Sequence, residues 1–537
     1  MRKLRRKTGK KVQFRHDPAP EELLQTLNEV PLFSELEAVL EKIQEIFGQA
    51  ADLVTRRLKV NSGQLALVYL DGMVNKTSVE KVLNEILLIR PQAEDAGLRL
   101  GTDLVRWLER GLAVGNVKVE ESFGGVVRGI LNGETALLAD GEGEALLLET
   151  EEFEKRAVSE PQVEALVRGP REGFVENIGT NLTMIRRRLR HPSLRVEKLV
   201  LGDLTNTKVA VLYLEGVALE AVVEEVRRRI RQIKIDGVLE SNYLEELIED
   251  SPFSIFPQIG TTERPDRAVA SLLEGRVLIL TDGTPFVLYV PMIFTSLIHS
   301  PEDYYHRWHL VLGIRLLRTL GFFITLFLPS VYIALTTFHQ ELIPTPLAIS
   351  LAMQREQVPY PAAVEAFLMQ LIFEILVEAG LRLPRPLGQA ISIVGALVIG
   401  EAAVQAGLVS AAMVIVISTT AIAAFLFPSY ELSLSVRLLR FPMMLLSSVL
   451  GLFGIFYGLM LLLTHLVQLR SFGLPFMTPM APFFARDQHD ELFRAPWWAM
   501  RKRPKIIGSS DPTRQTSSIS RKHLELEAEV EERKKEK

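Results

Sequence analysis

The sequence predicts a soluble region of two duplicated subdomains, of α+β or α/β class, followed by a polytopic all-α transmembrane domain. Residues 64–86 align without gaps to residues 208–230, and the apolar residues concentrate in residues 316–468. Residues 390–427 form an apolar run of 38 residues in which Glu401 is the one charged residue. As a helix this run would be roughly 57 Å long, nearly twice the core of a bilayer. We therefore expect two membrane helices that turn near residues 406–410.

Residues 1–60 are expected to be a basic, partly helical N-terminal tail. Seven of the first eleven residues are Lys or Arg. A secretory signal would continue with an apolar stretch of about 7–15 residues, but the polar sequence QFRHDPAPEEL follows. The N-terminal domain is therefore predicted to be cytoplasmic, with a tail that either contacts anionic headgroups or is a disordered solubilising end.

The two subdomains are predicted at residues 61–168 and 199–284. The aligned identities are Ala66, Tyr69, Leu70, Gly72, Val79, Glu80, Val82 and Ile86 against Ala210, Tyr213, Leu214, Gly216, Val223, Glu224, Val226 and Ile230. The stretches NGETALLADG and EGRVLILTDG form a second pair at nearly the same offset. Each copy is expected to contain a buried strand, a turn at Asp/Glu-Gly, an amphipathic helix and a later strand that ends in Asp-Gly.

A helix is predicted in the linker between the copies, residues 169–198. One apolar face is formed by Val175, Ile178, Leu182, Ile185 and Leu189, and arginines crowd the C-terminal turns. Two interpretations remain open. The helix either docks a partner or a membrane surface, or it packs between the subdomains.

The membrane domain is predicted at residues 285–484 and a polar C-terminal tail at residues 485–537. Spans are expected at about 319–338, 390–407, 410–428 and 442–467, and the segments 285–298, 364–380 and 471–484 are ambiguous. The basic group Arg307, Arg315 and Arg318 places the start of the first span in the cytoplasm. If 364–380 also spans, the number of spans is odd, and the C-terminus lies outside unless 471–484 re-enters the membrane. The charges leave its side undetermined.

No enzyme signature is found in the sequence. The motifs GxxxxGK[ST], GxGxxG and HExxH are absent, the chain contains no cysteine, and its nine histidines are scattered. A net charge of −4 gives no basic field for nucleic acid. We therefore expect no enzyme and nominate no catalytic, cofactor-binding or metal-binding residue.

The carboxylates of the apolar region carry its chemical content. Glu401 and Gln405 lie at i, i+4, on one helix face beside small residues. This face either lines a water-filled pathway, which becomes a ring of cation-selecting carboxylates in an oligomer, or holds a protonated Glu401 bonded to a neighbouring helix. Glu374 and Glu378 are also i, i+4 neighbours, whereas Glu365 lies on the opposite side. The 364–380 helix is thus either part of this polar face or an interfacial amphipathic helix.

Several long, collinear stretches resemble one family. They are GPREGFVENIGTNLTMIRRRLR, FPQIGTTERPD, LLEGRVLILTDGTPFVLYVP, SPEDYY, FEILVEAGLRLPRPLGQAISIVGALVIGEAAVQAG and SFGLPF. They are similar to the GerA-type spore germination proteins, the A subunits of nutrient germinant receptors. The resemblance implies an integral protein of the spore inner membrane that acts with a transporter-like B subunit and a lipoprotein C subunit. It also implies a homo-oligomer that conducts ions, and the related stage V AF branch implies an accessory channel.

The resulting hypothesis is a homo-oligomeric cation channel subunit that opens when a partner binds germinant. The segment 281–291, with Asp282, Gly283, Pro285 and Pro291, is the candidate that transmits movement of the soluble domains to the pore. The alternatives are an accessory channel, a non-conducting scaffold and a secondary transporter. A transporter predicts inverted repeats in the membrane half, and none is seen there.

Overall fold

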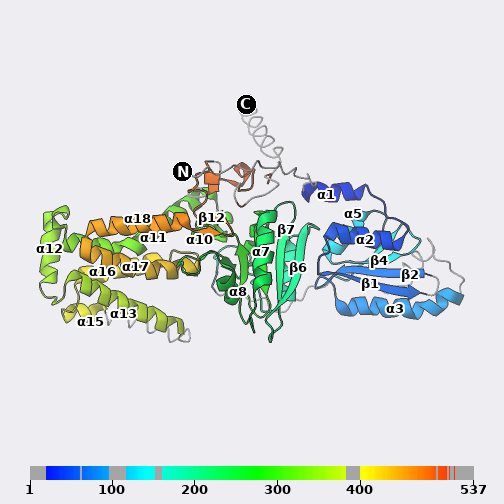
Figure 1. The fold of residues 1–537 in the computed structure, drawn as a ribbon, viewed down its shortest axis with the longest axis horizontal. Helices are drawn as coiled ribbons and strands as arrows, with labels where there is room; N and C mark the ends of the chain where they lie inside the picture. Colours follow the sequence, from blue (N-terminus) through cyan, green and yellow to red (C-terminus); the bar gives the residue numbers. More distant parts are fainter. Residues whose placement is uncertain are drawn as a thin grey trace, which may run out of the picture.

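The computed structural model describes residues 20–60, 63–95, 116–151, 160–161, 163–382, 400–485, 487–490, 494–504, 507 and 513–514. Three parts follow one another along its longest axis in Figure 1. We call them unit one (residues 20–151), unit two (residues 174–290) and the bundle (residues 308–468). Unit two lies between unit one and the bundle, so it is placed to connect them.

Unit one is an α+β fold around an antiparallel sheet. Its elements are α1 (Pro20–Asn28), α2 (Leu36–Phe47), β1 (Leu53–Val60), β2 (Gly63–Leu70), α3 (Lys76–Asp95), β3 (Val117–Glu120), α5 (Phe123–Asn132), β4 (Thr135–Ala139) and β5 (Ala145–Leu148). The strand order is β1-β2-β4-β5-β3. Every residue of β4 and β5 is buried, because helices cover this part of the sheet.

Unit two repeats this topology. Its elements are α6 (Ile178–Arg188), β6 (Leu194–Leu201), β7 (Thr207–Leu214), α7 (Glu220–Gln232), α8 (Ser241–Ile248), β8 (Gly260–Thr262), α9 (Pro265–Leu273), β9 (Val277–Thr281) and β10 (Val287–Val290). The strand order β6-β7-β9-β10-β8 matches that of unit one. The duplication in the sequence is therefore also a duplication of the fold.

The Asp-Gly turn after the fourth strand of each unit, β4 or β9, makes the same contacts in both copies. Asp140 Oδ1 accepts a hydrogen bond of 3.1 Å from the backbone N–H of Leu36, at the start of α2. In unit two, Asp282 Oδ1 accepts a 3.1 Å bond from Ile178, at the start of α6. The glycine after each aspartate has a positive φ, which glycine adopts without strain. These turns therefore cap α2 and α6, the helix directly before the first strand of each copy.

Both units begin earlier than the sequence predicted. Of the expected tail 1–60, the described part forms α1, α2 and β1, which pack into unit one. Likewise α6 and β6, expected within the linker 169–198 or at its edge, open unit two. The strands β1 and β6 lie at sheet edges, and their sequences LVTRRLKV and LRVEKLVL mix charged with apolar residues. Edge strands with one solvated face lack the apolar run that revealed β2 and β7.

The linker helix α6 packs between the two units, which agrees with the second of the two interpretations of its sequence. Asn177 caps it by accepting bonds from the backbone N–H groups of Gly179 (2.8 Å) and Thr180 (3.1 Å). Its side of contact with unit one carries Arg186, whose Nε and Nη2 donate to the two oxygens of Asp52 at 2.8 and 2.9 Å. Both side chains of this pair are 1% exposed. Arg186, one of the arginines in the C-terminal turns of this helix, thus binds unit one.

The bundle consists of α11 (Trp308–Thr337), α12 (Thr345–Arg355), α13 (Ala362–Arg382), α15 (Gly400–Gln405), α16 (Ala411–Ala424), α17 (Tyr430–Leu450) and α18 (Leu452–Gln468). By length and composition, α11 and α17 are the two helices within the described residues that could cross a membrane, and α16 and α18 are shorter apolar helices. The expected span 319–338 lies on α11 and 410–428 overlaps α16. Most of 390–407 lies outside the described residues.

The expected single span 442–467 is divided into two helices. Gly451, with φ +61°, separates α17 from α18, and a Cβ there would lie 3.0 Å from Cβ of Phe338. The chain turns back at this glycine, so α18 ends beside unit two, where the backbone N–H of Phe294 donates to the Phe476 carbonyl at 2.9 Å. The C-terminal segment therefore lies at the same end of the bundle as unit two.

Two of the ambiguous segments belong to unit two. Residues 285–298 contain β10 and the short helix α10 (Thr295–Ile298), and Tyr289 of β10 is 1% exposed in the unit's core. Residues 471–484 begin with a hairpin of β11 (Arg470–Ser471) and β12 (Leu474–Pro475) that packs on unit two. The third, 364–380, lies on α13 in the bundle.

Replacing Asp52 by alanine should loosen unit one from α6. The substitution leaves the Arg186 guanidinium buried without its partner, which typically costs about 3–5 kcal/mol. We expect a clear fall in the apparent melting temperature and faster proteolysis between the units. The control Glu37→Ala removes the solvent-exposed pair with Arg57, for which the expected cost is at most about 1 kcal/mol. Equal effects of the two substitutions would contradict the assignment.

Candidate functional site at the junction of unit two and the bundle

One hydrophobic core runs from unit two into the bundle. It contains Leu280, Tyr289, Met292 and Phe294 of the unit-two side together with Phe322 and Leu326 of α11, Leu432 and Val436 of α17, and Leu462 and Leu466 of α18. Phe294 lies near its centre, with ring centroids 5.9 Å from Phe322 and 6.2 Å from Phe476. Because protein interiors are close-packed, unit two cannot shift against these helices without disturbing this core.

The hairpin that follows α18 fixes the returning chain to unit two. Ser471 Oγ donates to the Gln258 carbonyl at 2.6 Å and accepts from the backbone N–H of Met292 at 2.8 Å. The next residue, Phe472, packs in the core that α7 and α8 form with the sheet of unit two. The Arg229 guanidinium lies 4.4 Å from its ring centroid. The SFGLPF stretch is therefore a part of unit two contributed by the C-terminal side of the chain.

The four residues of the predicted coupling segment have different surroundings. Asp282 and Gly283 contact the start of α6, in the same way as their counterparts in unit one, which has no bundle attached. Pro285 and Pro291 flank β10, and Met292 directly after Pro291 lies in the shared core. Among these four, Pro291 is thus nearest to the junction, while the Asp-Gly pair has a structural explanation.

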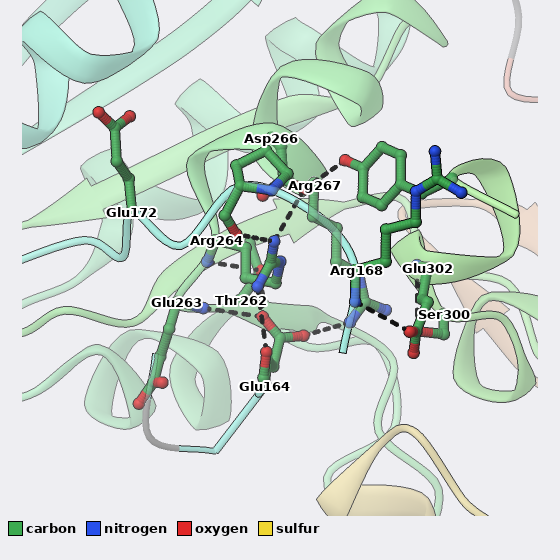
Figure 2. A network of polar contacts seen from close by, with 12 residues as sticks. Glu164, Arg168, Glu172, Thr262, Glu263, Arg264, Asp266, Arg267, Ser300 and Glu302 are labelled. Carbon is green, nitrogen blue, oxygen red and sulfur yellow. Dashed lines mark hydrogen bonds and ion pairs between the residues drawn. The ribbon is translucent and has the colours of Figure 1, made fainter. Parts of the chain in front are cut away.

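A buried arginine, Arg264, binds the extended segment that precedes α6. Arg264, 1% exposed at the start of α9, donates to the carbonyls of Glu164 at 3.2 Å and Pro170 at 2.8 Å. It also bonds Asp266 Oδ2 at 3.1 Å, as Figure 2 shows. Arg264 therefore holds the extended chain before α6 against α9.

Glu164 extends the same network toward the bundle. Its carboxylate accepts from Thr262 Oγ1 at 2.5 Å and pairs with Arg267 (Figure 2). Arg267 Nη2 in turn donates to Tyr289 Oη at 2.9 Å. Nearby, the backbone N–H of Arg168 donates to Glu302 at 3.2 Å. The stretches GPREGF, TTERPD and SPEDYY thus meet in space. The spacing of these stretches in the sequence did not predict that they contact one another. The one signal in the sequence was that all three belong to the stretches that resemble the family.

The SPEDYY stretch also holds the first helix of the bundle. Asp303, 2% exposed, accepts from Arg315 Nε at 3.1 Å and from Arg318 Nη1 at 2.8 Å. Arg315 Nη1 further donates to the Asp490 carbonyl at 2.8 Å. Arg315 and Arg318, two of the three arginines that the sequence placed on the cytoplasmic side, therefore lie at the unit-two end of α11 and are paired there.

A cavity of about 320 Å³ lies between α8, β8 and the first turn of α17. Glu240, Glu245 and Glu431 line it, and Thr261 Oγ1 donates to Glu431 at 2.6 Å. Burial raises the pKa of Glu245 to about 8, and the nearby charges of Glu431 and Glu249 act in the same direction.

Among the residues that the structure describes, no three His, Asp or Glu side chains are grouped to hold a metal ion.

The predicted polar face on α15 is present but solvent-exposed in the single chain. Gln405 Nε2 donates to Glu401 Oε1 at 3.1 Å, and both residues are exposed. On α13, Glu374 instead pairs with Arg437 of α17, whose Nε donates at 2.9 Å, and accepts from Gln370 at 2.8 Å. Glu378 lies one turn further along α13. Within the described part of the chain, Glu374 is therefore bonded inside the bundle, and Glu401 is bonded to Gln405 on its surface.

The sequence did not predict the role of Glu365. This carboxylate is 0% exposed and accepts from the backbone N–H and the hydroxyl of Ser410, both at 2.6 Å. Its Oε1 thus satisfies the start of α16, and its Oε2 lies 4.0 Å from Arg355 Nε. The partner is 45 residues away along the chain, so helix periodicity could not identify it.

The fold and the junction define a class of protein in which a duplicated α+β region shares its core with a bundle of apolar helices. The chain matches the family model described as Bacillus/Clostridium GerA spore germination protein over residues 41–506. The chain therefore belongs to the GerA family of spore germination proteins, as the sequence resemblance indicated, and membership of this family supports a role in a germinant receptor.

Individual relatives cover most of the chain. Spore germination protein KA of Bacillus subtilis (strain 168) is 46% identical over 471 residues, 87% of this chain and 86% of that protein. Membrane protein YfkQ of the same organism is 41% identical over 476 residues, 88% of this chain and 91% of that protein. The N-terminal domain of the A subunit of the Bacillus megaterium spore germinant receptor GerK3, a crystal structure, is 34% identical over 49% of this chain and 97% of that one, with a TM-score of 0.40.

Stability should fall as the pH rises through the range set by Glu245. The folded protein keeps this carboxyl protonated up to about pH 8, whereas the unfolded chain releases the proton near the ordinary pKa of 4.5. The unfolded state therefore binds fewer protons between these values, and stability is lost as the pH increases. Glu245→Gln should raise the melting temperature at pH 8 and flatten its pH dependence.

The groups that face Glu245 are Glu240, Glu246, Glu249 and Glu431. Glu246→Gln, at an exposed position of the same helix, is the matched control and should leave the slope unchanged. Melting curves of the full chain between pH 5 and 9 provide the measurement. A slope that persists in Glu245→Gln would show that another group causes it.

Proposed function

We propose that this chain is the membrane subunit of a spore germinant receptor and that it oligomerises into a channel that releases cations when partner subunits sense a nutrient. Membership of the GerA family supports the receptor role. The observation that carries the mechanism is the core shared by unit two and helices α11, α17 and α18. A movement of the soluble units is transmitted through this core to the helices.

The surface of the bundle supports its placement in a membrane. Exposed large apolar residues lie on several of its helices, including Leu310, Ile314, Leu317, Leu320 and Phe323 on α11, Leu368, Leu371 and Ile375 on α13, and Phe453, Phe456, Leu461 and Val467 on α18. An apolar surface of this extent is unfavourable in water. The paired arginines at the unit-two end of α11 support a cytoplasmic location of units one and two by the positive-inside rule, here in the spore inner membrane.

The exposed pair Glu401–Gln405 supports an aqueous path between copies of the chain. A carboxylate that faces lipid at the centre of a bilayer costs at least ~2.5 kcal/mol. In a homo-oligomer the same face would point to a neighbouring copy or to a water-filled pore, where its charge would be solvated and would attract cations. The alternative for this face is structural, a protonated Glu401 that bonds to a helix of the next copy.

The partners proposed are those that the family resemblance implies, a transporter-like B subunit that binds the nutrient and a lipoprotein C subunit. In this arrangement the chain contributes the ion path and no catalytic step. Two other roles in the same process are an accessory channel of the stage V AF branch and a non-conducting scaffold that positions the B subunit.

Glu401→Ala should reduce cation release severalfold while protein level and oligomer assembly stay normal. The change removes the one charge of the exposed polar face, so cations lose their site of attraction. Ion release from spores that carry the variant is the measurement, with Glu341→Ala, an exposed carboxylate between α11 and α12, as the control. Normal release from Glu401→Ala would exclude Glu401 as a pore group.

Purified protein in liposomes separates the channel from the scaffold. We expect cation flux from the wild-type chain, alone or with its partner subunits, and reduced flux from Glu401→Ala. Absence of flux under every condition, with the protein correctly inserted, would favour the scaffold.

A further inference from the structure

The loop after α8 presents a phenylalanine entirely to the outside. Phe253 is 101% exposed, at the apex of a turn closed by the bond from the backbone N–H of Ser254 to the Ser251 carbonyl at 3.0 Å. A phenylalanine ring that is fully exposed to water is unfavourable, because apolar surface gains free energy when it leaves water. An ordered turn that keeps it exposed therefore indicates a partner surface.

Two bonds fix this loop to the bundle. Ser254 Oγ lies 3.0 Å from Nε2 of His465, near the end of α18. Ser435 Oγ, in the second turn of α17, donates to the Ile255 carbonyl at 2.7 Å. The position of Phe253 relative to the helix ends is thus set by contacts of the two residues that directly follow it.

Further exposed apolar side chains lie on α8 and in the loop that carries Phe253. On α8, Tyr243 and Leu247 lie at i, i+4 on the outward face and are 42% and 52% exposed, and Ile255 is 39% exposed. We call these four residues, Tyr243, Leu247, Phe253 and Ile255, the apolar tip. It is unusual for a soluble surface to expose such a group without a binding role.

The apolar tip is continuous with the apolar surface of the bundle. Leu434 and Leu438 are exposed on α17 on either side of Ser435 and Arg437, and Val467 is exposed on α18 two residues after His465. Exposed aromatic residues stand at this end of two helices, Trp308 at the start of α11 and Tyr430 at the start of α17. Aromatic side chains at helix ends are typical of the boundary between lipid and water.

We propose that the apolar tip inserts into the interfacial layer of the lipid bilayer on the unit-two side and thereby docks unit two on the membrane. This inference rests on the proposed function, in which the bundle crosses the membrane. The partner is the boundary between headgroups and acyl chains. Glu246 and Glu249 beside the tip are acidic, so insertion is driven by apolar area and needs no anionic lipid.

Single-cysteine labelling tests the proposal, because the natural chain contains no cysteine. The full chain carrying Phe253→Cys is labelled with an environment-sensitive fluorophore and reconstituted into zwitterionic phosphatidylcholine vesicles. Lipids with a quencher at a shallow acyl position should quench the label severalfold more strongly than they quench the same label at Val200→Cys. Val200, on the opposite edge strand β6, is 61% exposed. The emission at position 253 should also be blue-shifted and unaffected by adding anionic lipid.

A third position separates failure of this inference from failure of the proposed function. Leu461→Cys, on the exposed face of α18, must be quenched by acyl-chain quenchers if the bundle crosses the bilayer. Quenching at 461 with water-like emission at 253 would overturn the docking of the tip alone. Lack of quenching at 461 would overturn the membrane placement of the bundle. A blue shift at 253 that depends on protein density and resists lipid quenchers would overturn lipid docking in favour of contact with a second copy.

Discussion

The core shared by unit two and the bundle is the constraint on which the rest of the molecule depends. Phe294 packs there against Phe322 of α11 and Phe476 of the returning chain, and burial of each such side chain contributes about 1.5–3 kcal/mol. Unit one is held to unit two by polar contacts. They include the buried ion pair of Arg186 with Asp52, the backbone bond from Ala51 to Val196, and side-chain bonds from Arg190 to Asn132, Arg195 to Ile46 and Lys198 to Ala51. The weaker attachment between units one and two is therefore where relative movement costs least, and unit two must move together with the helices.

The duplication explains why the two copies have different roles. Both sheets share one strand order, and both Asp-Gly turns cap the helix directly before the first strand of their copy. The copies diverge after their last strand in sequence. In unit one β5 ends at Leu148, and Thr150 after it bonds back to Thr135 of the same unit, whereas in unit two β10 continues through Pro291 into the shared core. Attachment to the bundle is therefore a property of the chain after β10 rather than of the repeated fold.

The sequence predicted the parts of the fold that have uniform apolar patterns. The sequence revealed the strands β2, β4, β7 and β9 because each is a buried apolar run. It revealed the turns because Asp-Gly or Glu-Gly follows each run directly. The edge strands β1 and β6 were not assigned to the units, since one face of each is solvated. The break at Gly451 was missed because an apolar run continues through it and only the backbone conformation marks the turn. The polar partners of Arg264, Glu374 and Glu365 come from distant segments, which no local spacing reveals.

The bundle separates its carboxylates into two kinds. Glu365 and Glu374 are bonded within one chain, to Ser410 and Arg437, so their polarity is satisfied before any assembly. Glu401 has only its neighbour Gln405 among the residues described and stays exposed beside apolar helices. In the proposed assembly, several chains that face one another would solvate this charge in a common path. The exposed position of Glu401 therefore supports the proposal that copies of the chain assemble.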